Sequence, residues 1–125
     1  MNTKITANKA PKALGPYSQA VVLGNLIFTS GQIALNPDTG SLEGETIKEQ
    51  THRVCKNLKV VLEASDSDFK NVVKTTCFLQ DMNDFADFNS VYGEYFTEKP
   101  ARSCVAVKEL PKGALVEVEV IAEKE

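Results

Sequence analysis

The chain has 125 residues, of which 14 are Lys or Arg and 17 are Asp or Glu, so its formal net charge is −3. A hydrophobic fraction of 42% with 25% charged residues is ordinary globular composition, and the length fits one domain over residues 1–125. A sequence pI near 5.2 argues against nucleic acid as a partner, and no apolar run reaches the roughly 20 residues that would cross a membrane.

The first predicted element is a β-hairpin. Two apolar runs, 21–23 and 26–28, flank the turn sequence Gly24-Asn25. The second strand is expected to continue towards Leu35, where the turn sequence Asn-Pro-Asp-Thr-Gly ends it. Apolar residues point to both faces of this strand, so we expect other elements or another chain to cover each face.

A long amphipathic helix follows the hairpin. Thr46 and Glu49 have the spacing of a capping box, in which each residue satisfies a free backbone N–H of the other. From Ile47 to Leu62 the apolar residues recur at intervals of three and four, which predicts one buried stripe. The helix is expected to end near Ser65.

A strand and a second helix come next. Residues 72–79 are rich in Val, Thr and Phe, which favours a strand. Asp81 or Asn83 can cap the helix that follows. Aromatic residues at helical spacing predict that this helix packs into the core. They are Phe85, Phe88, Tyr92, Tyr95 and Phe96.

The last quarter predicts two more strands, 102–107 and 115–122, joined through 110–113. The order is therefore β-β-α-β-α-β-β, and a short strand can precede Ala7. This order indicates an α+β fold, with both helices packed on one face of the sheet. The other apolar face then needs a cover, so we expect a homo-oligomer.

Cysteine and histidine are too sparse for a metal site or a disulfide framework. Cys55, Cys77 and Cys104 are an odd number, widely spaced and without a C-x-x-C pair. The only histidine, His52, has polar neighbours and is expected at the solvated surface. Reduced thiols and the lack of an apolar leader in the first 20 residues indicate the cytoplasm.

The chain has only two arginines. Arg53 falls on the polar side of the first helix and is expected to be solvated. Arg102 begins a strand and, by alternation, shares a face with Cys104 and Ala106. A guanidinium among such small side chains needs an anion, either a protein carboxylate or that of a ligand.

A pair of carboxylates supplies the candidate partner for Arg102. In 116–120 the side chains of Glu117 and Glu119 lie on one face of the strand and the valines on the other. If this strand pairs with the one that carries Arg102, a glutamate either neutralises the arginine or holds a water beside it. The residues alone leave both alternatives open.

Two glycine-bearing segments add weaker signals. In 29–32, Gly31 interrupts an apolar strand, and such a glycine often marks close approach of a ligand. The segment 15–18 presents the hydroxyl of Tyr17 on a loop. A bulge and a packed loop tyrosine account for these two features better. The chain has no phosphate-binding glycine loop, H-E-x-x-H motif or nucleophile elbow.

Taken together, several motifs resemble one known family, the reactive-intermediate deaminases of the RidA or YjgF type. The resemblance runs in order from about Ala10 to Ala122. Its most specific part is Pro-Ala-Arg-Ser with a downstream glutamate. The motifs are Gly-Pro-Tyr-Ser-Gln-Ala at 15–20, Thr-Ser-Gly-Gln at 29–32, Pro-Ala-Arg-Ser-Cys at 100–104, Leu-Pro-Lys at 110–112 and Val-Glu-Val-Glu at 116–119.

The resemblance implies a chorismate-mutase-like α+β fold, assembled as a homotrimer with a site at each subunit interface. Members hydrolyse 2-enamino and 2-imino acids, such as 2-aminoacrylate and 2-iminopropanoate, to 2-oxo acids and ammonia. Pyridoxal-phosphate enzymes release these substrates. The implied activity is that of a 2-iminobutanoate/2-iminopropanoate deaminase, with no metal or cofactor of its own.

The family's site residues can be carried over by motif. Arg102 would bind the substrate carboxylate and Glu117 would orient the attacking water. The loop 97–100 is shorter than is usual in the family and lacks an aromatic residue, which leaves the preferred substrate size open. The residues expected to line the pocket are Tyr17, Ser30, Gly31, Asn89 and Cys104.

Two other functions remain alternatives. A non-catalytic regulatory trimer that binds a small carboxylate would use Arg102 in the same way, but it would have little use for Glu117. Endoribonuclease activity, which is attributed to some relatives, fits poorly with the low pI and only two arginines. Glu117 is therefore the residue that separates catalysis from binding.

Overall fold

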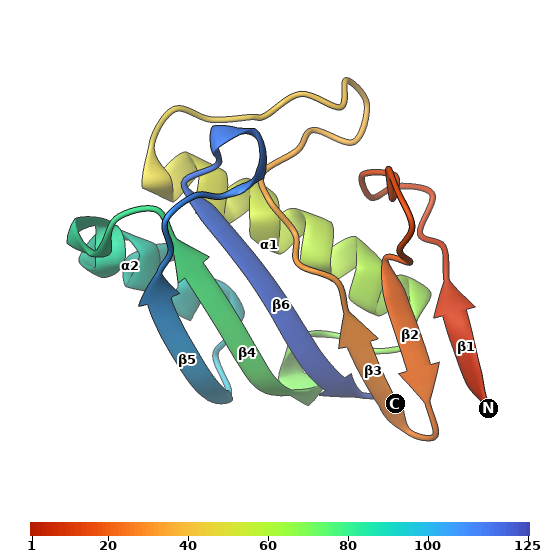
Figure 1. Ribbon diagram of the computed structural model, residues 1–125. Coiled ribbons are helices and arrows are strands. Elements are labelled where there is room, and N and C mark those ends of the chain that lie inside the picture. The colour runs from red at the N-terminus through yellow and green to blue at the C-terminus, as the bar shows by residue number, and fades with distance from the viewer.

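The computed structural model describes all 125 residues and contains one six-stranded sheet and two helices. Both helices lie against the same face of the sheet (Figure 1), so the predicted α+β class is confirmed. Neither helix is long and apolar enough to cross a membrane. The elements are β1 (Asn2–Ile5), β2 (Ala20–Leu23), β3 (Leu26–Thr29), α1 (Ile47–Ala64), β4 (Val72–Leu79), α2 (Phe85–Tyr95), β5 (Ala101–Ala106) and β6 (Val116–Glu123).

The strands are arranged in the order β1-β2-β3-β6-β4-β5. Every neighbouring pair is antiparallel except β4 and β5, which are parallel. The helix α2 connects these two parallel strands, as a parallel pair requires a crossover. The pairing of β5 with β6, which the sequence left as a condition, does not occur, because β4 lies between them.

The hairpin of β2 and β3 is confirmed, but its second strand is shorter than predicted. It ends at Thr29 and does not run on towards Leu35. The backbone N–H of Ser30 still donates to the carbonyl of Gln19 (2.9 Å), so the chain stays beside the segment before β2. Beyond that point Gln32 forms only an isolated bridge with β6.

The first helix forms as its sequence predicts. Thr46 Oγ1 accepts a hydrogen bond from the N–H of Glu49 (3.2 Å), and Glu49 Oε1 accepts one from the N–H of Thr46 (3.1 Å). The apolar stripe, with Val54, Leu58 and Val61 among its members, is completely buried against the sheet. This packing holds α1 across the strands on one side.

The second helix buries its aromatic stripe, as predicted, but its cap differs from the expectation. The Asp81 side chain accepts from the N–H of Asn83, which caps a short 3-10 turn and not α2. The helix begins at Phe85, after Asp84, which makes no capping bond. The reason is that the 3-10 turn is inserted between the capping residue and the helix.

The sheet face away from the helices is apolar and uncovered in one subunit. On β6 the valines point to the helices, so Glu117 and Glu119 point to this outer face. Leu23, Phe28 and Val105 share the outer face with exposed fractions of 53%, 38% and 48%. Exposed apolar area of this kind on a sheet favours a cover by another chain.

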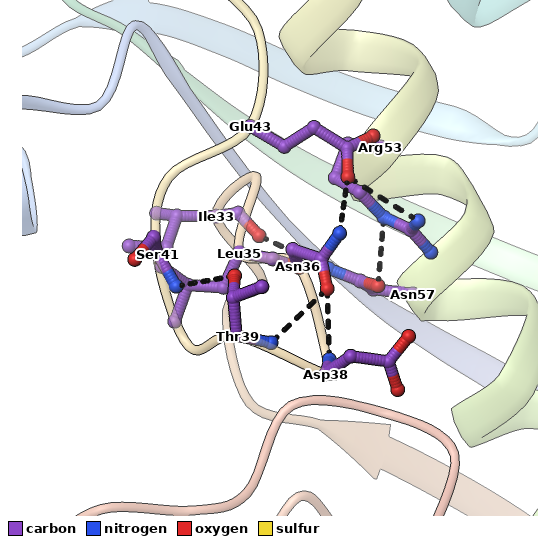
Figure 2. A network of polar contacts seen from close by, with 9 residues as sticks. All are labelled: Ile33, Leu35, Asn36, Asp38, Thr39, Ser41, Glu43, Arg53 and Asn57. Atoms are coloured by element: carbon purple, nitrogen blue, oxygen red, sulfur yellow. Dashed lines mark hydrogen bonds and ion pairs between the residues drawn. The ribbon is translucent and has the colours of Figure 1, made fainter.

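Two polar residues predicted to be solvated are partly buried. The Arg53 side chain is only 16% exposed, because it bonds to Asn57 and approaches Glu43 at 3.8 Å (Figure 2). His52 Nδ1 lies 2.9 Å from the hydroxyl of Tyr95. Both predictions were wrong because the loop after β3 and the helix α2 cover this side of α1, which helical periodicity alone does not reveal.

Candidate active site

Arg102 is held at the edge of the sheet by residues of α2. Its Nη1 donates to Asn89 Oδ1 (2.7 Å), and its guanidinium carbon lies 4.9 Å from the ring centre of Tyr92 and 5.3 Å from that of Phe85. The amide and the two ring faces orient the guanidinium without neutralising it. No carboxylate of the chain lies within 4.0 Å of Arg102, which leaves its charge available to an external anion.

A pocket of about 440 Å³ lies beside Arg102. We call Arg102 with Asn89 and this pocket the arginine half of the site. Part of the wall comes from the loop 97–100, which the sequence analysis found to be short. The lining residues are Tyr92, Gly93, Phe96, Thr97, Lys99, Pro100 and Arg102.

Cys104 lies two residues along β5, on the same face as Arg102. It pairs with Cys77 of β4 and is half-buried. Burial raises the pKa of the Cys104 thiol, and the nearby positive charge of Arg102 only partly opposes this. The thiol is therefore protonated at neutral pH, which disfavours a thiolate nucleophile.

A larger pocket, of about 670 Å³, contains Glu117 and lies where the loops before β2 and after β3 meet one end of the sheet (Figure 1). Tyr17, Ser30 and Gly31, all predicted from sequence, line it. We call this pocket the glutamate half of the site. Its other lining residues are Pro11, Lys12, Leu14, Gln19, Thr29, Gln32, Ile33, Leu35, Pro111, Lys112 and Glu119.

Gly31 allows the Glu117 side chain to lie directly against the backbone. A β-carbon at residue 31 would lie 2.7 Å from Cδ of Glu117 and 2.9 Å from its Cγ. The neighbouring Ser30 is fixed by its hydroxyl, which donates to the carbonyl of Ser18 (2.6 Å). Tyr17, on the same loop, is 51% exposed at the pocket. Thus a glycine is required wherever this carboxylate occupies its observed position.

The environment of Glu117 makes it a stronger base than an exposed glutamate. Partial burial raises the pKa of its carboxyl above the usual value, and the negative charge of Glu119 raises it further. A carboxylate with a raised pKa accepts a proton more readily near neutral pH. Glu117 therefore has the character of a general base for a bound water.

Within one subunit the two halves lie on opposite faces of the sheet. Arg102 pairs with Thr75, which is buried beneath the helices and bonded to Tyr92. Glu117 pairs with Phe78, on the outer face. The ion pair between Arg102 and a glutamate, expected as one alternative, does not form.

Sequence analysis missed the aromatic platform under Arg102. Tyr92 and Phe85 were assigned only to the core, yet their rings also hold the guanidinium. It missed the two cations of the glutamate half, Lys12 and Lys112, as well. The Leu-Pro-Lys motif at 110–112 is the one signal that could have identified Lys112. The other neighbours come from elements that pack together only in the folded sheet.

Comparison with known proteins agrees with the fold and the motifs. Residues 7–124 match the family described as Endoribonuclease L-PSP. A RutC family protein of Pyrococcus abyssi is 53% identical over 122 residues, which cover 97% of this chain and 96% of the relative. The chain belongs to the RidA/YjgF family. The resemblance of its motifs is thus confirmed.

Solved structures of RidA/YjgF proteins superpose closely on this chain. YyfA of Yersinia pestis, described as a member of the conserved Rid protein family, is 45% identical, with a TM-score of 0.95 over 98% of this chain and 99% of YyfA. TdcF of E. coli, solved with bound serine, is 39% identical, with a TM-score of 0.92 over 98% and 99% of the two chains.

In this chain, no three His, Cys, Asp or Glu side chains are grouped closely enough to hold a metal ion.

Proposed function

We propose that this protein is a deaminase that hydrolyses small 2-imino acids and their 2-enamino tautomers to 2-oxo acids and ammonia. The observation that carries the proposal is an oriented arginine without a carboxylate partner in a fold that also presents a basic, half-buried glutamate. A cation that binds a carboxylate and a base that activates water are the two groups that this hydrolysis needs.

Arg102 binds the substrate carboxylate in this proposal. Asn89 occupies one N–H of the guanidinium and leaves the others available for a carboxylate. The planar fork of arginine matches the two oxygens of a carboxylate, so the contact fixes orientation as well as position. The rings of Phe85 and Tyr92 keep the fork in place before the substrate arrives.

A complete site needs a second subunit, because one chain presents Arg102 and Glu117 on opposite faces of its sheet. We propose a homotrimer in which the arginine half of one subunit meets the glutamate half of its neighbour. The exposed apolar side chains of the outer face support this assembly, since a neighbour would bury them. The trimeric state itself comes from the resemblance to the family.

The reaction follows from these positions. Glu117 accepts a proton from a bound water as the water oxygen bonds to C2 of the imine, and the C=N electron pair moves to nitrogen. The nitrogen takes this proton from Glu117, which gives a tetrahedral intermediate with one hydroxyl and one amino group on C2. The hydroxyl proton then passes through Glu117 to the amino nitrogen as the C=O bond forms and the C–N bond breaks, and the nitrogen leaves as ammonia. Overall, the imino acid and one water give the 2-oxo acid and ammonia.

The substrate class is supported by the relative TdcF, whose structure contains serine. Serine carries the carboxylate next to a carbon bearing nitrogen, the same arrangement as in a 2-imino acid. Three free cysteines also suit a reducing compartment, and we propose a cytoplasmic location on that ground. Which imine the protein meets there depends on the enzyme that releases it.

A second candidate function is binding of a small carboxylate without turnover, as in a regulatory trimer. The arginine half alone suffices for that role, so a measurement of turnover distinguishes the deaminase from the binding protein. Endoribonuclease activity is a weaker candidate, although the family's description carries that name. In the larger pocket the two lysines, Lys12 and Lys112, are matched by two carboxylates, Glu117 and Glu119, so the pocket offers no net positive charge to an RNA backbone.

A coupled assay tests the proposal. A pyridoxal-phosphate dehydratase generates 2-aminoacrylate from serine, and pyruvate release is timed with the wild-type protein, with Glu117→Gln, or with no addition. Glu123→Gln is the matched control, because Glu123 lies on the same strand but outside the pocket. We expect faster release with the wild type and the control only. Binding of pyruvate without acceleration would instead support the regulatory role.

A further inference from the structure

Asn57 is a completely buried polar residue on the sheet-facing side of α1. Its Nδ2 donates to the carbonyl of Leu35 (2.9 Å) and to that of Ile33 (3.3 Å), as Figure 2 shows. Neither carbonyl belongs to a helix or a strand. Because the buried Asn57 amide must itself be hydrogen-bonded, these two bonds tie the chain just after the end of β3 to α1.

Arg53 sets which way the Asn57 amide faces. Arg53 Nε donates to Asn57 Oδ1 (3.2 Å), so the amide nitrogen must point towards the two carbonyls. Arg53 Nη1 also lies 3.8 Å from Glu43 Oε1, and that oxygen accepts a bond from Asn36 Nδ2 (2.8 Å). The network in Figure 2 therefore fastens the loop after β3 to α1 at several points.

The segment that Asn57 holds also forms a wall of the glutamate half. Gln32 and Val118 exchange backbone hydrogen bonds of 2.9 and 3.1 Å, which attach the segment to β6. Gly31 lies against the Glu117 side chain, and Ile33 lines the pocket. Residues 31–35 are thus held from β6 on one side and from α1 on the other.

We propose that Asn57 is a positioning residue for Glu117. By holding the carbonyls of Ile33 and Leu35, it keeps the Gly31 backbone against the Glu117 side chain and so fixes where the carboxylate holds water. The inference rests on the proposed deamination, but the geometry that carries it, a buried amide binding the wall of the pocket, does not depend on the substrate.

The proposal predicts an effect on turnover more than on substrate binding. Arg102 binds the carboxylate from the other half of the site, which the Asn57 network does not touch. Loosening residues 31–35 would move Glu117 relative to its water and let more solvent reach it. The charged groups that share the pocket with Glu117 are Glu119, Lys12 and Lys112, and none of them contacts Asn57.

Two variants test the proposal. Asn57→Leu keeps a similar volume but removes both donors, and Arg53→Met removes only the bond that orients the amide. We expect Asn57→Leu to lower kcat about 10-fold, since misplacement of a reacting group by about 1 Å can cost about 100-fold, with KM changed less than about 2-fold. Arg53→Met should lower kcat in the same direction but less.

A second readout uses no imine. Carbon-13 NMR titration of the Glu117 carboxyl should give a pKa in Asn57→Leu that has moved down from the wild-type value towards the usual 4.5. Ser67→Ala is the matched control, because it removes a buried side-chain bond to the carbonyl of Glu123 (2.6 Å) far from the pocket. The control should lose stability without changing kcat or the Glu117 titration.

The outcomes separate this proposal from the proposed function. Wild-type protein without turnover would contradict deamination, yet the titration would still test Asn57. A folded Asn57→Leu with wild-type kcat and wild-type Glu117 titration overturns the positioning role, as does an equal effect of Ser67→Ala. If Asn57→Leu does not fold, Arg53→Met is measured in its place. A lowered kcat with a shifted Glu117 titration then supports the positioning role, and wild-type values overturn it.

Discussion

Arg102 and Glu117 lie on opposite faces of the same sheet, separated by the strand β4. The pairing of Arg102 with Thr75 places it with the helices, and the pairing of Glu117 with Phe78 places it on the outer face. Each group is therefore isolated from the other's charge within one chain. A fold that keeps its one unpaired arginine away from a carboxylate with a raised pKa leaves both groups available to a ligand.

Weakening the hold on the carboxylate should raise KM. Arg102→Lys keeps a positive charge but loses the planar fork and its contact with Asn89. We expect KM to rise about 10-fold to 100-fold, because a hydrogen bond to a charged group contributes about 1.5–3 kcal/mol. Steady-state kinetics on 2-iminopropanoate measure this, with Lys108→Arg as the control, because it exchanges the same two cations at an exposed position. An unchanged KM would show that the arginine does not bind substrate.

The Glu117 carboxyl should make stability depend on pH. Because the folded protein raises the pKa of Glu117, its stabilising contribution is complete below the unfolded pKa and is lost as the pH rises through the folded pKa. Glu117→Gln should therefore raise Tm at pH 7 by about 1–3 °C and leave it unchanged near pH 3.5. Glu123→Gln, on the same face but outside the pocket, should change Tm equally at the two pH values. If Glu117→Gln also changes Tm equally at both pH values, burial of the charge is not the cause of the change.

Adding one methyl group at Gly31 should displace Glu117. The new β-carbon would lie 2.7 Å from Glu117 Cδ, so the side chain must move. We expect Gly31→Ala to cost less than about 1 kcal/mol of unfolding free energy, because the obstructing atoms end a flexible side chain that can turn away, and to lower kcat about 10-fold or more.

A double variant provides the check on that clash. Gly31→Ala combined with Glu117→Ala should recover the lost stability without recovering activity, because the two positions are in direct contact. Thermal unfolding of the four proteins gives the interaction energy between the positions. Strict additivity of the two single changes would contradict the contact.

Local signals in the sequence predicted the local structure well. The capping box at Thr46 and Glu49 and the hairpin turn at Gly24-Asn25 depend on residues that are neighbours in the chain, and both predictions are confirmed. Alternation along β6 also separated the valines from the two glutamates correctly. Such patterns act over a few residues, so the sequence contains all that determines them.

Predictions that depended on long-range pairing fared worse. Nothing in the sequence states that β4 lies between β5 and β6, so the expected meeting of Arg102 with a glutamate on the adjacent strand was wrong. Arg53 was assigned to solvent because the loop that covers it is distant in sequence. Which groups share a site depends on these long-range contacts, and in the proposed assembly the meeting of Arg102 with Glu117 also depends on a second chain.

Mixing two inactive variants tests most directly whether neighbouring subunits share each site. In the proposed trimer, Arg102→Ala subunits keep intact glutamate halves, and Glu117→Gln subunits keep intact arginine halves. If subunits exchange at a ratio of one to one, about one quarter of the interfaces should combine two intact halves, which should restore about one quarter of wild-type turnover. Exchange is verified by native mass spectrometry. Mixed trimers that stay inactive would contradict the shared site, and with it the proposed mechanism.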